Sequence, residues 1–141
     1  MMIDYSKLQK SLKHLEMQFQ NYSHSQQRPE LTTLDREGIA ESTIQRFETC
    51  YDALWKLLKR YLITELGLPD VPNSPKPIFR LAGENLLLVS PVEHWMRYAD
   101  ARIGTAHDYD GEKATLCLAL VPAFIADATA LYQTMSKERW E

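Results

Sequence analysis

An arginine, a histidine and a tyrosine lie close together in the segment 100–112, which also carries four carboxylates. Arg102 is followed after four residues by His107, and His107 is followed after one residue by Tyr109. An imidazole can take a proton from a ribose 2′-hydroxyl or give one to a leaving oxygen, and a guanidinium can hold a phosphate and its developing charge. The pair would support metal-independent cleavage of RNA. This chemistry would fail on DNA, which lacks the 2′-hydroxyl.

The helices around this segment decide whether Arg102 and His107 can act together. In one unbroken helix, five residues would separate the two side chains by roughly 140° around the axis, on different faces. They converge only if the helix ends near Gly104, or if a two-fold axis brings Arg102 of one subunit to His107 of another. Both routes predict a site at a helix end, and the second requires a homodimer.

A purely structural role for the same residues is an alternative hypothesis. Arg102 would then form a salt bridge with Asp100, Asp108 or Asp110, and His107 would interact with the last carbonyls of a helix. Short patterns of this kind arise often by accident. The residues alone therefore leave a catalytic site and a capped helix junction open.

Other catalytic and metal-binding patterns find no support in the sequence. His14, His24 and His94 have no His, Cys or carboxylate neighbours at metal-ligand spacing, so we predict no metal site. Serine nucleophile motifs, glycine-rich phosphate loops and zinc patterns are also missing. Cys50 and Cys117 lie in apolar periodic surroundings, which favours buried thiols over a disulfide and suits a reducing cytosol.

Length and composition indicate a single folded domain, residues 1–141. The chain has 45% hydrophobic and 25% charged residues and a net charge of −3. This charge does not predict general attraction to nucleic acid, and the longest basic cluster is 56–60. The N-terminus lacks the pattern of a signal peptide, and we expect no apolar stretch long enough to span a bilayer. We therefore expect a cytoplasmic protein without a membrane partner.

Apolar residues recur every three or four positions along most of the chain, which predicts an all-α, up-and-down bundle of about five helices. The expected helices run from Asp4 to about Tyr22, from a start between Asp35 and Ser42 to Gly67, from Pro75 to about Leu88, from Ser90 to about Gly104, and from about Gly111 to Ser136.

Several local features accompany these helices. Ser74 is the expected N-cap of the third helix, and Ser90 with Glu93 has the spacing of a capping box for the fourth. Asp110 is expected to cap the last helix, and Pro122 should kink it. That helix is apolar nearly all round, so it should either run through the centre of the bundle or give one face to another subunit.

The helical spacing also predicts which side chains are buried on two of the helices. On the second helix, Tyr51, Trp55 and Tyr61 could form a stacking platform for bases, but their spacing favours a place in the core. On the fourth helix we expect an apolar face to be buried, formed by Val92, Trp95, Met96, Ala99 and Ile103.

The sequence resembles a family of helical toxins. Arg102, His107 and Tyr109 match the Arg-x4-His-x-Tyr motif of HEPN-domain toxins, in the branch labelled nucleotidyltransferase substrate-binding proteins. The segments 44–48 and 55–59, the proline-rich turn and the segment 107–110 also follow the order of that branch. The resemblance covers roughly Ile39 to Tyr132.

The resemblance implies a helical homodimer with a composite cleft, encoded beside a small nucleotidyltransferase. The HEPN protein of such a pair is an endoribonuclease toxin, with Arg102 and His107 as the catalytic residues by position. Apart from the resemblance, Asp100 and Asp108 are candidate supporting residues because they lie close to this pair in the sequence. The partner is an antitoxin that transfers AMP from ATP to the motif tyrosine, here Tyr109, so ATP is used by the partner and no cofactor is implied for this chain. An ester at that position would fill the cleft and add negative charge where RNA must bind.

The resemblance also leaves alternatives open. The older family label implies a non-catalytic subunit that binds a substrate for the nucleotidyltransferase. Many HEPN nucleases carry a polar residue directly after the motif arginine, whereas this chain has Ile103, for which we expect apolar packing. A third hypothesis is a plain structural bundle, in which the segment 100–112 joins two helices.

Overall fold

The computed structural model describes residues 2–106 and 111–141. Within these ranges the chain is helical and contains no strand, which confirms the predicted all-α fold with five helices. These are α1 (Ser6–His24), α2 (Thr33–Thr64), α3 (Pro75–Glu84), α4 (Val92–Thr105) and α5 (Gly111–Ser136), and a short 3-10 turn, Ser25–Gln27, follows α1.

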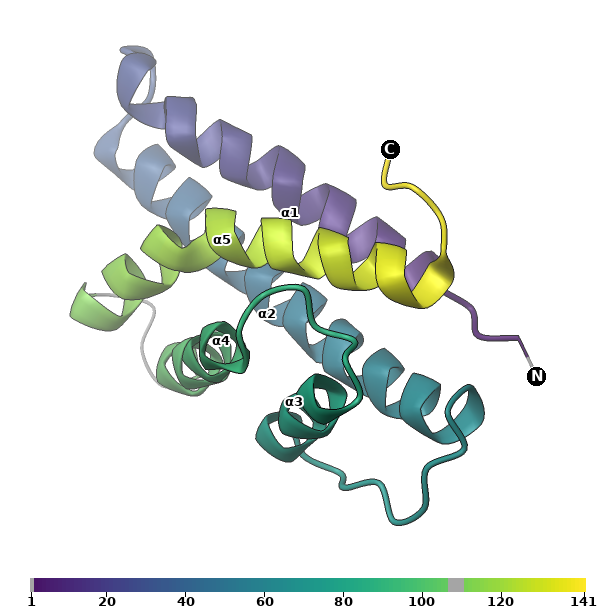
Figure 1. Ribbon diagram of the computed structural model, residues 1–141. Helices are drawn as coiled ribbons and strands as arrows, with labels where there is room; N and C mark the ends of the chain where they lie inside the picture. The colour runs from purple at the N-terminus through teal and green to yellow at the C-terminus, as the bar shows by residue number, and fades with distance from the viewer. Residues whose placement is uncertain (1, 107–110) are drawn as a thin grey trace.

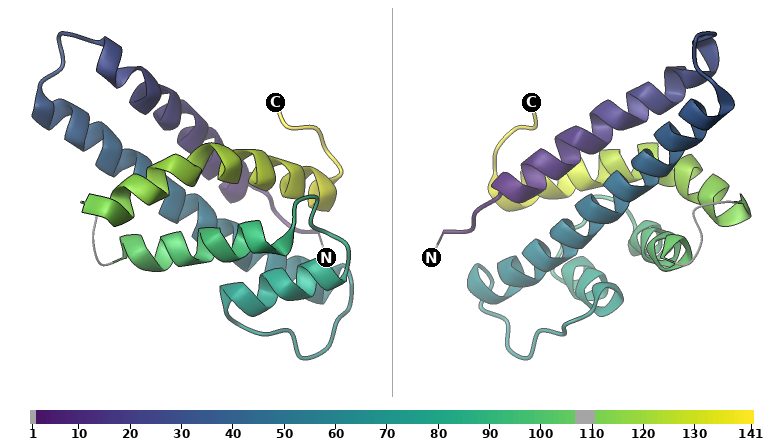
Figure 2. Two further views of the ribbon diagram at one scale, coloured as in Figure 1. Left: turned by 60° about the vertical axis from the view of Figure 1, so that its left-hand side comes forward. Right: turned by 180° about the vertical axis from the view of Figure 1, so that it is seen from behind.

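The long helix α2 organises the bundle, because it contacts each of the other four α-helices. Helices α1 and α2 form an antiparallel hairpin, and α5 lies against both (Figure 1). Helices α3 and α4 form a smaller pair beside the C-terminal half of α2, as the two further views show (Figure 2). Side chains of α2 can therefore contact residues at the end of α4.

The first turn of α2 begins earlier than the sequence analysis expected. The Thr32 hydroxyl accepts a hydrogen bond of 3.0 Å from the Asp35 backbone N–H, and the Asp35 carboxylate accepts one of 2.9 Å from the Thr32 N–H. This reciprocal capping box starts the helix at Thr33. The helix ends at Thr64, just before Gly67, whose φ of 63° is the left-handed conformation that glycine adopts without strain.

The expected starts of α3 and α4 are only partly correct. Helix α3 begins at Pro75, but the Ser74 side chain makes no capping hydrogen bond, and the helix ends at Glu84, before the expected Leu88. The predicted capping box of Ser90 is wrong, since α4 begins at Val92 and its N-cap position is taken by Pro91. The extended ψ of Pro91, 148°, leaves Ser90 one residue too far from the helix to cap it.

Aromatic rings from four helices meet in the core. Phe124 of α5 is fully buried and packs edge-on against Phe47 of α2, at 4.9 Å between ring centroids, and against Tyr98 of α4, at 5.3 Å. Trp95 of α4 stacks on Phe79 of α3 at 4.8 Å. These contacts fix α4 against α2 and α5, and thereby set the place of the residues near the end of α4.

Helix α5 has the predicted bounds and continues through Pro122, and its ribbon is bent (Figure 1). The expectation that no stretch is long and apolar enough to cross a bilayer is wrong, because Gly111–Ser136 meets both criteria. A helix that packs in a protein core meets the same criteria. One face of α5 is indeed buried in the bundle, through Cys117, Val121, Phe124, Ala128 and Leu131.

Candidate functional site

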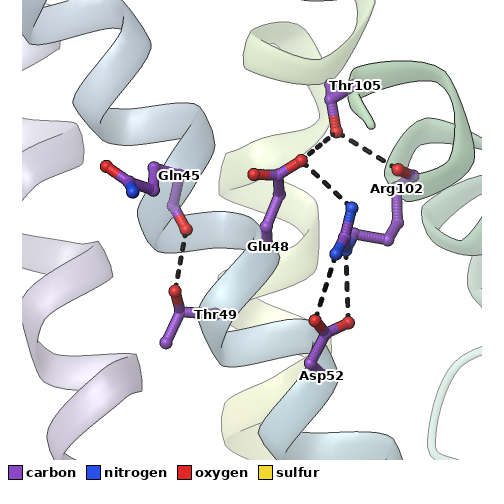
Figure 3. A network of polar contacts seen from close by, with 6 residues as sticks. All are labelled: Gln45, Glu48, Thr49, Asp52, Arg102 and Thr105. Carbon is purple, nitrogen blue, oxygen red and sulfur yellow. Dashed lines mark hydrogen bonds and ion pairs between the residues drawn. The ribbon is translucent and has the colours of Figure 1, made fainter. Parts of the chain in front are cut away.

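Arg102 lies in the last turn of α4 and is bound to two carboxylates of α2 (Figure 3). Its Nε and Nη2 donate hydrogen bonds of 3.2 Å to the two oxygens of Asp52, and its Nη1 donates one of 3.1 Å to Glu48 Oε2. The bidentate contact with Asp52 uses the planar fork of the guanidinium. Arg102 thus joins the end of α4 to the middle of α2.

Thr105 completes this group of residues one turn later. Its hydroxyl donates a hydrogen bond of 2.9 Å to the same Glu48 oxygen that binds Arg102. Thr105 and Glu48 are both buried, and the Arg102 side chain is 28% exposed. A buried carboxylate is stable only with such partners. We call Glu48, Asp52, Arg102 and Thr105 the ion-pair cluster.

The ion-pair cluster carries one cation and two anions, so its formal charge is negative. The charge of Glu48 also affects α5, because burial first and then this carboxylate raise the pKa of Cys117 to about 12. A phosphate would have to compete with Asp52 and Glu48 for the guanidinium, because both carboxylates already bind it. Asp52 is the more accessible of the two, with 38% of its side chain exposed against 11% for Glu48.

A cleft of about 680 Å³ opens beside Arg102, between α2, the start of α3 and the end of α4. We call it the Arg102 cleft. Its wall combines the cations of Lys76 and Arg102 with the carboxylate of Asp52 and two aromatic side chains, and it is lined by Tyr51, Asp52, Trp55, Ser74, Pro75, Lys76, Pro77, Ala99, Arg102, Ile103 and Ala106. Mixed charge and aromatic surface would suit a ligand with both a phosphate and a base.

Of the remaining predicted site residues, the structure describes only Asp100. Asp100 does not pair with Arg102 in the described contacts; its carboxylate accepts a hydrogen bond of 2.6 Å from Lys76. His107, Asp108 and Tyr109 lie outside the described residues, as does the expected helix cap Asp110, and their roles stay predictions.

Ile103 corrects an expectation about the apolar face of α4. We expected its side chain to be buried, but it is 58% exposed and lines the Arg102 cleft. Trp95 and Ala99 of the same predicted face are buried as expected. Ile103 differs because it lies at the edge of the buried stripe of α4, which continues to Thr105 at the end of the helix.

The partners of Arg102 were not predicted from the sequence. Glu48 lies four residues after Ile44 and directly follows Phe47, and it therefore falls within the apolar stripe of α2. A carboxylate at a core-facing position signals a buried ion pair, and Asp52 lies one turn further along the helix. That signal was present in the sequence, but the helix that supplies the cation could not be identified without the fold.

The comparisons with known proteins identify the family. Residues 3–137 match the family described as nucleotidyltransferase substrate binding protein like. The chain therefore belongs to this family. The family description matches the label of the branch that the sequence resembles. No match was found among curated proteins.

Solved structures agree with the fold. HI0074 from Haemophilus influenzae has a TM-score of 0.83 and 24% identity, over 94% of this chain and 99% of that chain. Its structure is described as revealing the fold of a substrate binding domain of a nucleotidyltransferase. A second similar structure, ttk003001694 from Thermus thermophilus, has a TM-score of 0.69 and 26% identity, over 92% of this chain and 97% of that chain.

Proposed function

We propose that the protein is an endoribonuclease toxin of the HEPN type that works with a nucleotidyltransferase partner. The observation that carries the proposal is the position of Arg102, in the last turn of α4 and at the wall of the Arg102 cleft. Ala106 lines the same cleft, and the next residue in the sequence is His107. The family match supports the partner, since its description refers to nucleotidyltransferases.

In the proposed reaction the RNA supplies its own nucleophile. His107 of one subunit takes the proton of a ribose 2′-hydroxyl, whose oxygen attacks the adjacent phosphorus, and Arg102 holds the phosphate and its added charge. The 5′-oxygen leaves with a proton from a second imidazole, supplied by His107 of the other subunit of a homodimer. The products are a 2′,3′-cyclic phosphate and a 5′-hydroxyl, and the reaction requires neither a metal nor a cofactor of this chain.

The partner neutralises the toxin by modifying Tyr109. The phenol oxygen attacks the α-phosphorus of ATP, pyrophosphate leaves, and the phenol proton is released, so that an AMP ester remains on the tyrosine. The added phosphate repels RNA from the segment that contains His107, and the nucleoside fills space in the cleft. Both proteins act in the cytoplasm, where RNA and ATP are available.

The experiment is RNA cleavage by the purified protein in the presence of a metal chelator. We expect the wild type to cleave RNA and leave cyclic phosphate ends, and we expect His107→Ala to be inactive while it keeps the helical circular dichroism spectrum and oligomeric state of the wild type. Growth arrest on expression should follow the same pattern. Cleavage by His107→Ala would show that His107 is not a catalytic residue.

The ion-pair cluster supports a second candidate, a non-catalytic subunit that binds a substrate for the nucleotidyltransferase. Arg102 is held by Glu48 and Asp52, and this arrangement suits a structural role for the guanidinium. A protein that leaves every RNA intact but forms a stable complex with its partner would favour this candidate. If the variants of Arg102, His107 and Tyr109 changed neither activity nor complex formation, the segment would be a plain helix junction.

A further inference from the structure

Trp55 is more exposed than Tyr51 and Tyr61, the two residues of α2 with which it could have formed a stacking platform. Tyr51 and Tyr61 are 1% and 8% exposed, as expected, but Trp55 is only half-buried. Its side chain lines the Arg102 cleft on one side and a second cavity on the other. The two cavities therefore adjoin at Trp55.

The second cavity is basic. It has a volume of about 440 Å³, and we call it the basic groove; it is lined by Trp55, Lys56, Lys59, Arg60, Ile63, Thr64 and Asn73. Three of these side chains are cations and none is an anion, although the whole chain has a net charge of −3. Local positive charge on an acidic protein attracts a polyanion to this place more than to the rest of the surface.

The two cavities are joined along one face of α2. Asp52, Trp55 and Lys59 follow one another at spacings of three and four residues, which places them on the same side of the helix. The helical rise puts Lys59 about 10 Å beyond Asp52, the partner of Arg102. A single continuous path thus leads from the guanidinium, over the indole, to the three cations.

We infer that this path binds single-stranded RNA, with one base stacked on Trp55 and the following phosphates held by Lys59 and its neighbours. An aromatic ring bordered by cations is the combination that binds single strands, because every base has a face to stack and every linkage has a charge. A duplex keeps its bases paired and offers none to the indole. The inference rests on the proposed function for the choice of RNA, and it names the substrate as unpaired.

The neighbours of Trp55 are compatible with a bound base. The Lys56 ammonium lies 5.9 Å from the indole centroid, at the outer limit of a cation–π contact, and its side chain is exposed and able to turn toward a phosphate. Lys59 donates a hydrogen bond of 2.9 Å to the Asn73 side chain, which holds its ammonium over the groove. The other occupant to consider is an acidic face of a protein partner.

The test measures binding by fluorescence anisotropy with a labelled oligouridylate of about 12 nucleotides, within the length range of single-strand sites. We expect Trp55→Ala to weaken binding roughly tenfold, because one stacked base is lost. Lys59→Ala should weaken binding and lower the slope of log affinity against log salt by about 0.7, the value for one phosphate contact on a single strand. Trp55→Ala should leave that slope unchanged.

Matched controls separate these effects from general ones. Lys10 is an exposed lysine of α1, away from both cavities, and Lys10→Ala should bind RNA as the wild type does. A duplex of the same length should bind more weakly than the single strand. If circular dichroism shows that Trp55→Ala is poorly folded, two other variants are measured instead. Trp55→Phe keeps a ring and should bind RNA with near wild-type affinity. Arg60→Ala removes an exposed cation and should lower the salt slope.

The binding test is independent of cleavage. Weaker binding by the Trp55 and Lys59 variants would support the path even if the protein cut no RNA, in which case the proposed function alone would fail. Affinity equal to the wild type in both variants, or tighter binding of the duplex, would overturn the inference even if cleavage were observed. Variants that bind RNA normally but lose the complex with the nucleotidyltransferase would overturn it in favour of a protein interface.

Discussion

The guanidinium of Arg102 and the carboxylate of Asp52 form a bidentate ion pair, with two hydrogen bonds of 3.2 Å between the end of α4 and the middle of α2. The residue proposed to hold a phosphate thus already holds a carboxylate, which has a similar shape and charge. The pair gives the site a defined resting arrangement. It also means that RNA must displace Asp52 to reach the guanidinium, or bind beside an intact pair.

We expect Arg102→Ala to destabilise the protein by about 2 kcal/mol, because the buried Glu48 carboxylate would lose its ion pair with the guanidinium. Urea unfolding followed by circular dichroism measures this change. Arg28→Ala is the matched control: it removes an arginine from an exposed ion pair with Glu30, and its effect should stay within about 0.5 kcal/mol. Equal effects of the two substitutions would show that the ion-pair cluster does not stabilise the fold.

Asp52→Asn separates a phosphate-binding role of Arg102 from a purely structural one. The substitution removes a negative charge from the Arg102 cleft and weakens the hold on the guanidinium, while Glu48 still satisfies it. If Arg102 binds the phosphate, the affinity for single-stranded RNA should rise several-fold, by roughly 1 kcal/mol. Anisotropy titrations of the wild type and Asp52→Asn provide the comparison. An unchanged affinity would leave Arg102 outside the binding site.

Stability should fall at alkaline pH because of the buried thiols. Burial raises the pKa of Cys50 from 9.0 to about 12. Above pH 9 the unfolded state releases this proton while the folded state keeps it, so the free energy of unfolding decreases as pH rises from about 9 toward 12, by up to about 1.4 kcal/mol per pH unit for one thiol.

Cys50→Ala tests this account of the alkaline pH range. The variant lacks the thiol, so its free energy of unfolding should fall less steeply above pH 9 than that of the wild type, although its stability at neutral pH is lower because a buried side chain has been shortened. Urea titrations at several pH values measure both slopes. Parallel slopes would mean that the Cys50 thiol ionises as readily in the folded protein as in the unfolded one.

The periodic pattern of apolar residues was sufficient to predict most of the fold. The bounds of α5, the core positions of α2 such as Phe47 and Leu54, and the start of α3 at Pro75 all follow from local sequence. The start of α4 did not, because Ser90 and Glu93 have the spacing of a capping box but the backbone of Pro91 is extended. Spacing alone cannot show which residue takes the N-cap conformation.

The site was less predictable than the fold. Arg102 was found from its spacing to His107, but its partners Glu48 and Asp52 lie about 50 positions earlier in the sequence. Only the packing of α4 on α2 brings them together. Trp55, which the spacing placed in the core, packs against the core but is only half-buried and also lines two cavities, and a helical stripe does not show this degree of exposure.

The most direct test of the proposed function follows one RNA substrate before and after modification of the protein. The purified protein is first incubated with single-stranded RNA and a metal chelator. A second sample is treated with the nucleotidyltransferase, ATP and Mg²⁺, and the modified residue is mapped by peptide mass spectrometry. The cleavage assay is then repeated on the treated protein. We predict cleavage before treatment, AMP on Tyr109 after it, and no cleavage by the modified protein, while Tyr109→Phe should cut RNA and resist neutralisation. An unmodified protein that leaves RNA intact, or an AMP-bearing protein that still cuts it, would contradict the account.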